Sequence, residues 1–261
     1  MALRHEHERP VPLPSHWVVV NGLRMHYRAA GTGSRAVVLV HGLTVSGNYL
    51  LPTAAKLLAN FTVYVPDFPG FGASEKPRRV QDMADLAETL KAWMDAIGLE
   101  QAYLLGNSMG CHVIAIMAAL HREHVAGTIF VSPVGHPGRR NTLWLVMRAL
   151  NDFVREPRSL WAIMFRDFLK AGGRRTVLTL NHMQECPLEV WLPQVHIPSL
   201  VVRGGRDRIV PERWIERVVA LLPQGRGAVI GDAGHVPNFS HPARLTALVR
   251  AFVENSDGWW K

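Results

Sequence analysis

The feature that most constrains the fold is a regular alternation of short apolar runs with longer stretches of helical spacing. Strand, helix and strand in this repetition are typical of a mostly parallel sheet with helices on both faces. β-Branched runs without polar interruption are typical of buried parallel strands. We predict core strands at residues 36–40, 62–65, 102–105, 128–131, 199–203 and 228–230, with helices at 48–59, 80–97, 108–120, 212–221 and 241–254.

Two parts of the chain depart from this alternation. Residues 16–20 and 23–28 are predicted as strands joined by Asn21-Gly22, a strong hairpin signal that adds antiparallel strands at one edge of the sheet. The interval 136–197 has no convincing strand, and apolar residues at helical spacing predict helices near 141–151, 158–171 and 174–183. We therefore expect a flexible tail at 1–15, a core at 16–135 and 198–261, and a helical cap, or lid, at 136–197 inserted after the sixth strand.

Composition excludes several classes of protein. The chain has 261 residues, of which 48% are hydrophobic and 19% charged, which favours one folded domain with an insertion over a disordered protein. The net charge of +8 is carried mainly by arginine, but no dense basic run with interleaved aromatics indicates nucleic-acid binding. Two cysteines, no secretory signal and no apolar run of about 18 residues predict a cytoplasmic protein without a membrane span.

The strongest chemical signal is Gly106-Asn107-Ser108-Met109-Gly110, a G-x-S-x-G sequence. It follows a predicted strand and opens an apolar helix, which is the context of a nucleophile elbow. In such a turn the serine is projected above the sheet, and its crowded neighbours need to be glycine. We predict Ser108 as a catalytic nucleophile, in preference to an ordinary serine at a helix N-terminus.

A serine hydroxyl needs a base to take its proton, and an elbow of this kind places its partners in the chain order Ser, Asp or Glu, His, at strand ends. Asp207 follows a predicted strand through Gly204-Gly205-Arg206, and His235 follows the last one through residues 231–234. We predict His235 as general base and Asp207 as the carboxylate that orients it. Asp232 is a competitor, but it lies too close in sequence to His235 to brace it easily.

The segment His41-Gly42-Leu43-Thr44 also follows a predicted strand. Here the useful groups are backbone amides, and we predict that the N–H groups of Leu43 and Met109 stabilise a developing oxyanion. His41 is expected to tie the loop together, because the predicted triad already supplies a base. Asp67, in the Pro- and Gly-rich loop after the next strand, is also expected to be structural.

Together, the motifs HGLT, DFPGFGAS, GNSMG, GGRD and GHVPN, in that order and at these spacings, resemble the α/β-hydrolase superfamily. The resemblance covers the chain from residue 16 onward apart from the cap, and it implies the α/β-hydrolase fold. GNSMG also resembles the elbow of the meta-cleavage product hydrolases, which cleave a carbon–carbon bond. Those enzymes usually carry a Ser-Gly-Pro-Gly-like oxyanion loop, whereas this chain has HGLTVSG. Epoxide hydrolases and haloalkane dehalogenases use an aspartate where Ser108 stands.

We therefore predict a serine esterase or thioesterase, similar to carboxylesterases, that needs no metal or organic cofactor. Aromatic and methionine side chains of the cap are candidates for an apolar acyl pocket. Residues 136–182 carry nine Lys or Arg and three Asp or Glu, so the substrate could be anionic or carrier-bound, although solvated helix faces explain the same charges. The alternatives are a carbon–carbon hydrolase, an acyltransferase, lyase or cyclase, and a ligand-binding receptor. The pocket candidates are Trp144, Met147, Trp161, Met164 and Phe165.

Overall fold

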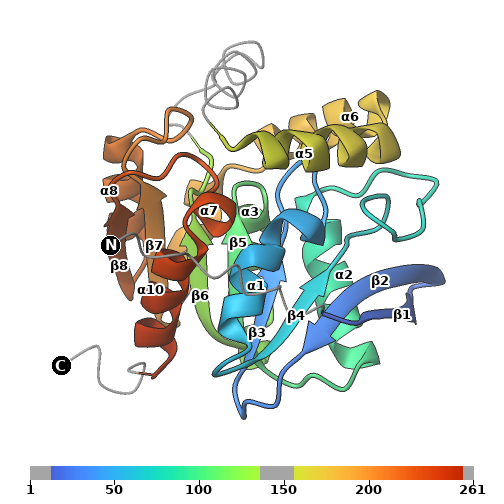
Figure 1. Ribbon diagram of the computed structural model, residues 1–261, viewed down its shortest axis with the longest axis horizontal. Coiled ribbons are helices and arrows are strands. Elements are labelled where there is room, and N and C mark those ends of the chain that lie inside the picture. Colours follow the sequence, from blue (N-terminus) through green and yellow to red (C-terminus); the bar gives the residue numbers. More distant parts are fainter. Residues whose placement is uncertain (1–12, 136–155, 255–261) are drawn as a thin grey trace, which may run out of the picture.

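The computed structural model describes residues 13–135 and 156–254, which contain one eight-stranded sheet in the order β1-β2-β4-β3-β5-β6-β7-β8 (Figure 1). β1 pairs antiparallel with β2, and β2 with β4, while all other neighbours are parallel. This confirms the predicted α/β-hydrolase fold class, including the antiparallel edge hairpin, which turns through Asn21 at φ 49°. The strands are β1 (Ser15–Val20), β2 (Leu23–Ala30), β3 (Ala36–Val40), β4 (Thr62–Pro66), β5 (Ala102–Asn107), β6 (Val125–Val131), β7 (Ser199–Gly204) and β8 (Gly225–Ile230).

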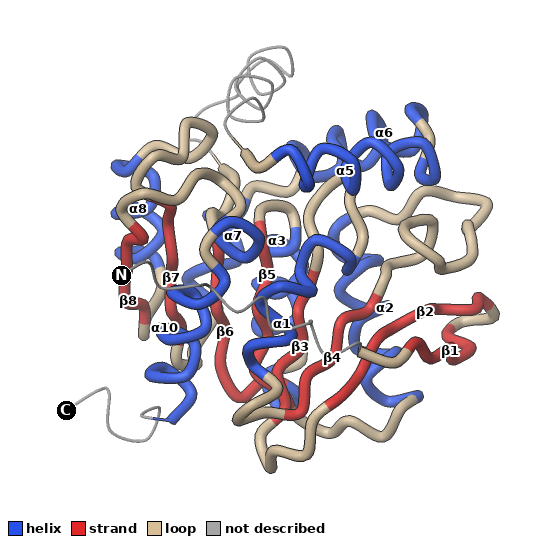
Figure 2. The backbone as a smooth tube through the Cα atoms, in the orientation of Figure 1, coloured by secondary structure: helices blue, strands red, loops and turns tan. Residues whose placement is uncertain are grey.

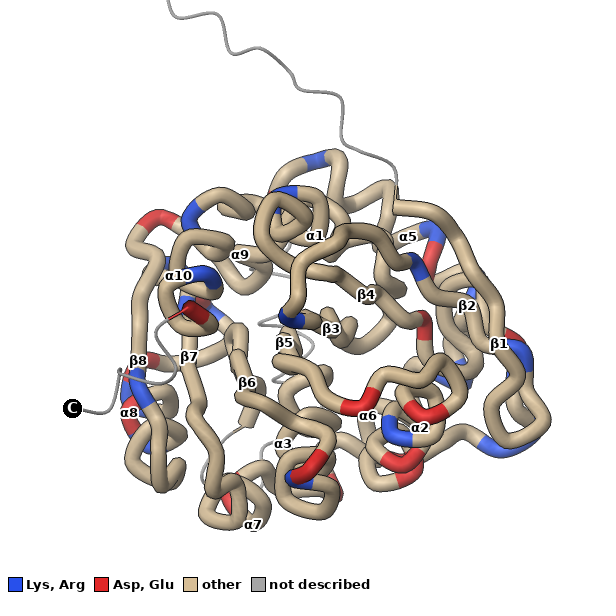
Figure 3. Tube along the Cα trace, turned by 90° about the horizontal axis from the view of Figure 1, so that it is seen from below, with Lys and Arg blue, Asp and Glu red and all other residues tan. Residues whose placement is uncertain are grey.

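Helices cover both faces of the sheet, as Figure 3 shows in a view rotated onto the strand ends. One face packs against α1 (Leu51–Leu57) and α10 (Pro242–Glu254), and the other against α2 (Met83–Ala96), α3 (Gly110–Leu120) and α8 (Glu212–Leu221). The central strands β3 and β5 are buried almost throughout because both their faces are covered. Lys and Arg are interspersed with Asp and Glu around the rim in this view rather than gathered in one stripe.

Several element boundaries differ from the sequence prediction, and a capping motif explains one of them. The helix predicted from residue 80 begins only at Met83, because the Asp82 side chain accepts a hydrogen bond from the Asp85 backbone N–H while Asp85 caps Asp82 in return. Strand β5 runs two residues further than predicted, and carries the chain directly into Ser108. Short helical turns that periodicity did not reveal are η1 (Gly47–Leu50), η2 (Arg122–His124), η3 (Leu192–Gln194) and α9 (Pro237–Ser240).

The chain between β6 and β7 leaves the sheet and returns to it, and its described part, residues 156–197, is termed the inserted segment below. It contains α5 (Arg158–Ala171), α6 (Gly173–Glu185) and α7 (Leu188–Trp191), and α5 and α6 lie across one end of the sheet (Figures 1 and 2). The predicted helix at 158–171 has the observed bounds, whereas the helix expected at 141–151 lies outside the described residues, as does most of the expected tail. None of the described helices is long and apolar enough to cross a bilayer.

Candidate active site

The turn between β5 and α3 holds Ser108 in a conformation that few side chains adopt. Its φ is 55°, in the left-handed region that costs a non-glycine residue free energy. A Cβ added at Gly106 would lie 2.5 Å from the carbonyl oxygen of Gly110, and one added at Gly110 would lie 2.5 Å from that of Val40. The two glycines of the motif are therefore required by backbone contacts, as expected for a nucleophile elbow.

Asp207 and His235 meet at the same end of the sheet, following β7 and β8. The Nδ1 atom of His235 is 2.9 Å from Oδ2 of Asp207, and both side chains are buried. The other oxygen, Oδ1, accepts hydrogen bonds from the backbone N–H groups of Ile209 and Val210, at 2.8 and 2.9 Å. Burial raises the pKa of the Asp207 carboxyl, but His235 and the Val210 N–H outweigh it and hold the pKa below its usual value. The carboxyl is therefore an anion at neutral pH, fixed to accept from the imidazole.

Two charged residues that the sequence analysis did not single out brace the turns that carry this pair. The guanidinium of Arg203, at the end of β7, donates to the carbonyl oxygens of Asp207 and Val210 at 3.0 and 2.9 Å. The buried carboxylate of Glu156, at the start of the inserted segment, accepts from the backbone N–H of Val236 at 3.2 Å. These contacts fix the backbone next to Asp207 and next to His235. No local sequence motif predicts either contact.

A buried hydrogen-bond chain joins the predicted oxyanion loop, the elbow and the histidine. The backbone N–H of Gly42 donates to the Tyr49 hydroxyl at 2.8 Å, and that hydroxyl donates to Oδ1 of Asn107, also at 2.8 Å. The Asn107 amide in turn donates to the carbonyl oxygens of Val131 and His235, at 3.1 and 3.3 Å. Asn107 occupies the unspecified second position of the motif, and Tyr49 gives no sequence signal, so neither was predicted.

The loop after β3 passes close to Ser108, since a Cβ added at Gly42 would lie 3.5 Å from the serine Cβ. Among the described residues, the backbone N–H groups of Leu43 and Met109 have no hydrogen-bond acceptor. The imidazole of His41 accepts from the Phe68 N–H at 3.0 Å through Nε2, which leaves Nδ1–H to donate to the Gly42 carbonyl at 2.8 Å. Burial lowers the pKa of His41, so it is a neutral ring that holds the loop.

Asp67 has the structural role expected of it. One oxygen accepts from the Gly47 N–H at 2.7 Å, and the other accepts from the Ala73 N–H at 3.0 Å and lies 2.8 Å from Nδ1 of His26. Burial raises the pKa of Asp67, but these partners, His26 first, more than offset it and hold the pKa below its usual value. This carboxylate therefore joins its own loop to β2 and to the start of η1.

The predicted pocket residues are not brought together as a set. Trp144 and Met147 lie outside the described residues, while Trp161 and Met164 are half-buried on α5, where Met164 packs against the core. Phe165 is 66% exposed because α5 turns Leu160 and Ala171 inward instead, so it does not line an enclosed pocket. Periodicity predicted the helix but not which of its faces is buried.

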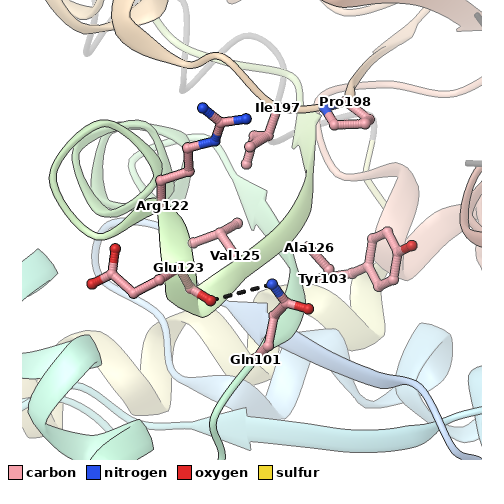
Figure 4. Close-up of a pocket in the computed structure, with 8 residues that line it drawn as sticks. All are labelled: Gln101, Tyr103, Arg122, Glu123, Val125, Ala126, Ile197 and Pro198. Atoms are coloured by element: carbon pink, nitrogen blue, oxygen red, sulfur yellow. Dashed lines mark hydrogen bonds between the residues drawn. The ribbon is translucent and has the colours of Figure 1, made fainter.

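One surface hollow of about 610 Å³ lies elsewhere (Figure 4). Its walls come from the beginnings of β5 and β6 and from Ile197 and Pro198 just before β7. Parallel strands carry their ligand sites at their carboxyl ends, where Ser108 and Asp207 stand. The hollow is thus at the opposite end of the sheet from the candidate site. Within residues 13–135 and 156–254, no group of three His, Cys, Asp or Glu is arranged to hold a metal ion.

Comparison with known proteins agrees with this architecture. Residues 37–248 match the model of the alpha/beta hydrolase family. The chain is 29% identical to a 2-hydroxy-6-oxononadienedioate/2-hydroxy-6-oxononatrienedioate hydrolase of Burkholderia vietnamiensis, over 88% of this chain and 91% of the relative. It is 26% identical to the pimeloyl-[acyl-carrier protein] methyl ester esterase of Edwardsiella ictaluri, over 88% of this chain and 97% of that one.

Among solved structures, a thermophilic esterase from Thermogutta terrifontis superimposes with a TM-score of 0.79 at 25% identity, covering 93% of this chain and 99% of the esterase. The family match spans most of the chain, including the predicted elbow, the predicted oxyanion loop and both turns that carry Asp207 and His235. The chain therefore belongs to the alpha/beta hydrolase family.

Proposed function

We propose that this hydrolase cleaves a carboxylic ester or thioester through a Ser108-His235-Asp207 triad. The observation that carries the proposal is the buried 2.9 Å contact between His235 and Asp207 at the sheet end where Ser108 is held at φ 55°. Oδ2 of Asp207 accepts a hydrogen bond from the Nδ1–H of His235, so Nε2 is the unprotonated nitrogen of the neutral ring and can act as the base. That tautomer is the one a serine nucleophile needs.

The proposed reaction is acyl transfer in two halves. Ser108 Oγ attacks the substrate carbonyl while Nε2 of His235 takes the hydroxyl proton, and the oxyanion accepts from the Leu43 and Met109 N–H groups. Such donors typically contribute about 3 kcal/mol each to the transition state. The imidazolium gives its proton to the leaving alcohol or thiol. Water, deprotonated by His235, then attacks the acyl-enzyme, and the proton returns to Ser108 as the acid leaves.

A substrate with an apolar acyl part and a negative charge suits the inserted segment. Half-buried Trp161 and Met164 on α5 are the described members of the proposed acyl pocket. On α5 and α6 four exposed residues are basic and one, Glu185, is acidic, because the other carboxylate, Asp167, is buried. The name of the first relative above includes a dioate, which is an anionic substrate. The name of the second includes an ester carried by an acyl-carrier protein. The basic residues that are exposed on α5 and α6 are Arg158, Arg166, Lys170 and Arg174.

Salt tests this charge preference independently of the triad. Hydrolysis of an ester with a distal carboxylate should slow as ionic strength rises, while a neutral ester of the same chain length should be unaffected, because exposed charges are screened within about 10 Å at 0.1 M salt. An equal response of both esters would contradict the preference for anionic substrates.

The Ser108→Ala variant tests the nucleophile. It should lose labelling by a fluorophosphonate probe, and turnover of a p-nitrophenyl ester should fall by several orders of magnitude. Ser199→Ala is the control, because Ser199 lies at the start of β7, at the end of the sheet opposite Ser108. It should keep the label. Retained turnover in Ser108→Ala would show that another residue is the nucleophile.

A carbon–carbon bond hydrolase with the same triad is the second candidate, favoured by the similarity to the 2-hydroxy-6-oxononadienedioate hydrolase. A dienone acid assayed beside a simple ester separates the two reactions, since the kcat/KM ratio assigns the preferred substrate. Incorporation of label from isotopic water into the acid product distinguishes either hydrolysis from acyl transfer or lyase chemistry.

A further inference from the structure

The inserted segment touches the predicted oxyanion loop through one buried carboxylate. Oδ2 of Asp167, on α5, accepts the backbone N–H of Ser46 at 3.0 Å and the Ser46 hydroxyl at 2.5 Å. The two residues are 121 positions apart, and both are essentially inaccessible to solvent. Ser46 lies three residues after Leu43, whose N–H is the proposed oxyanion donor. The contact therefore links the segment above the sheet to the loop that borders Ser108.

A buried carboxylate such as Asp167 costs more free energy than is needed only to attach the inserted segment to the core. Burying an anion is unfavourable unless hydrogen bonds satisfy it, and apolar side chains would hold the segment at less cost. The guanidinium of Arg166 reaches only the other oxygen, Oδ1, at 3.3 Å, and is itself half exposed. Both hydrogen bonds to Oδ2 thus come from Ser46. They fix the direction of the Ser46 backbone N–H, which apolar packing would not do.

The loop needs such fixing because it is strained between Leu43 and Ser46. Thr44 has a φ of 64°, and a β-branched residue is a genuine outlier in the left-handed region. Conformations of this kind persist only where their surroundings over-determine them. On the amino-terminal side the Tyr49 hydroxyl holds the Gly42 N–H, and on the other side Asp167 holds Ser46. Without the hydrogen bonds to Asp167, the peptide units between Gly42 and Ser46 would relax toward ordinary dihedral angles.

The other carboxylate at this loop comes from the core. The N–H of Gly47 donates to Oδ1 of Asp67, so adjacent amides are held by one carboxylate from the core and one from the inserted segment. The Ser46 hydroxyl also caps η1 by accepting from the side chain and the backbone N–H of Asn48. Asp67 fixes where η1 begins, while Asp167 fixes the residue that joins η1 to the strained turn.

We infer that Asp167 is a positioning residue that aims the Leu43 N–H at the oxyanion through Ser46, so that the oxyanion loop is correctly set only while the inserted segment is seated on the core. This inference rests on the proposed triad and oxyanion function. It makes the segment a part of the catalytic machinery in addition to its proposed contact with the substrate.

The test is a set of variants assayed on a neutral p-nitrophenyl ester. Asp167→Ala should lower kcat by about 10- to 100-fold with little change in KM, since a small displacement of an oxyanion donor has effects of this size. Labelling by the fluorophosphonate should slow in parallel. Asp167→Asn should retain most of kcat, because its Oδ1 can still accept from Ser46. Leu169→Ala, on the solvent face of the same helix, is the control and should match the wild type.

A second substitution separates positioning from simple attachment. Thr44→Gly removes the strain, because glycine adopts a positive φ without steric cost. In the Asp167→Ala background it should restore kcat by at least several-fold, whereas loss of attachment alone would not respond to it. An unchanged kcat in Asp167→Ala, an effect confined to KM, or no restoration by Thr44→Gly would each overturn the inference.

Failure to fold does not end the test. If Asp167→Ala is insoluble, Asp167→Leu, which removes both hydrogen bonds to Ser46 while filling the buried space, is measured in its place, with and without Thr44→Gly, and the same two outcomes are decisive. Ser108→Ala runs in the same series: if it retains turnover, the proposed triad fails whatever the Asp167 variants do. If Ser108→Ala is inactive while Asp167→Ala matches the wild type, only the inference about the loop fails.

Discussion

Asp207→Asn should lower kcat strongly without unfolding the protein, because the two carboxylate oxygens of Asp207 have different hydrogen-bond partners. Oδ1 is held by the N–H groups of Ile209 and Val210, and Oδ2 accepts from His235. In Asp207→Asn the amide oxygen keeps the two backbone donors, since an NH₂ there would face N–H groups. The amide NH₂ must then face Nδ1 of His235.

This orientation reverses the tautomer of the ring. Nδ1 becomes the acceptor, the proton moves to Nε2, and Nε2 can no longer take the proton of Ser108. The equivalent exchange in a serine protease triad lowers kcat by about 10⁴-fold, which corresponds to about 5.5 kcal/mol in the activation free energy. We expect the same order here, because the contact between His235 and Asp207 is 2.9 Å and both side chains are buried. The melting temperature should change little, since both backbone hydrogen bonds survive.

The assay is kcat for a p-nitrophenyl ester at neutral pH, with thermal unfolding measured on the same samples. Asp232→Asn is the matched control: it is the competing carboxylate, exposed and paired with Arg244 and His241 rather than with the catalytic ring. It should keep wild-type kcat. A kcat within tenfold of wild type for Asp207→Asn, in a folded protein, would refute the tautomer argument and the role of Asp207 with it.

Two further predictions concern the framework of the site. Gly110→Ala should destabilise the fold by about 1–3 kcal/mol and slow probe labelling, because its Cβ would lie 2.5 Å from the Val40 carbonyl oxygen, a backbone atom held in the sheet. A melting temperature unchanged from wild type would contradict this. Burial lowers the pKa of His41, so below its ordinary pKa of about 6.5 the unfolded chain binds a proton that the folded chain does not. The stability that this histidine contributes should be fully present above that pH and fall by up to about 1.4 kcal/mol per pH unit below it, and a urea midpoint that is flat from pH about 7.5 to 5.5 would contradict a neutral His41.

The sequence predicted the fold and the three proposed catalytic residues because local patterns determine them. Ser108 sits between glycines that the turn requires, and Asp207 and His235 each follow a strand through a glycine-containing turn. Parallel strands bring their carboxyl ends to one edge, so the order of elements along the chain is enough to gather the three. The backbone, more than any single side-chain contact, makes this part predictable.

The supporting residues could not be predicted in the same way. Tyr49 acts through Asn107, which is 58 positions away, and Asp167 acts through Ser46, which is 121 positions away. Neither pair has a fixed spacing, and on α5 an aspartate that directly follows Arg166 looks like an ordinary solvated position in the sequence. Phe165 shows the complementary failure: α5 carries apolar residues on both faces, so periodicity alone could not tell that this ring is exposed.

Backbone strain in the described residues is concentrated around the candidate site. Apart from Asn21 in the edge hairpin, the non-glycine residues with positive φ are Thr44, Ser108 and Ser132, and these follow β3, β5 and β6 at the same end of the sheet. Each costs free energy that only its fixed surroundings can offset, and those surroundings are the buried hydrogen bonds described above. A sheet packed on both faces supplies a rigid base, so strain can be kept at its carboxyl edge without loosening the core. Substitutions that let these residues leave the strained conformation should therefore lower kcat, whereas Thr44→Gly, which lets the same conformation form without strain, should not.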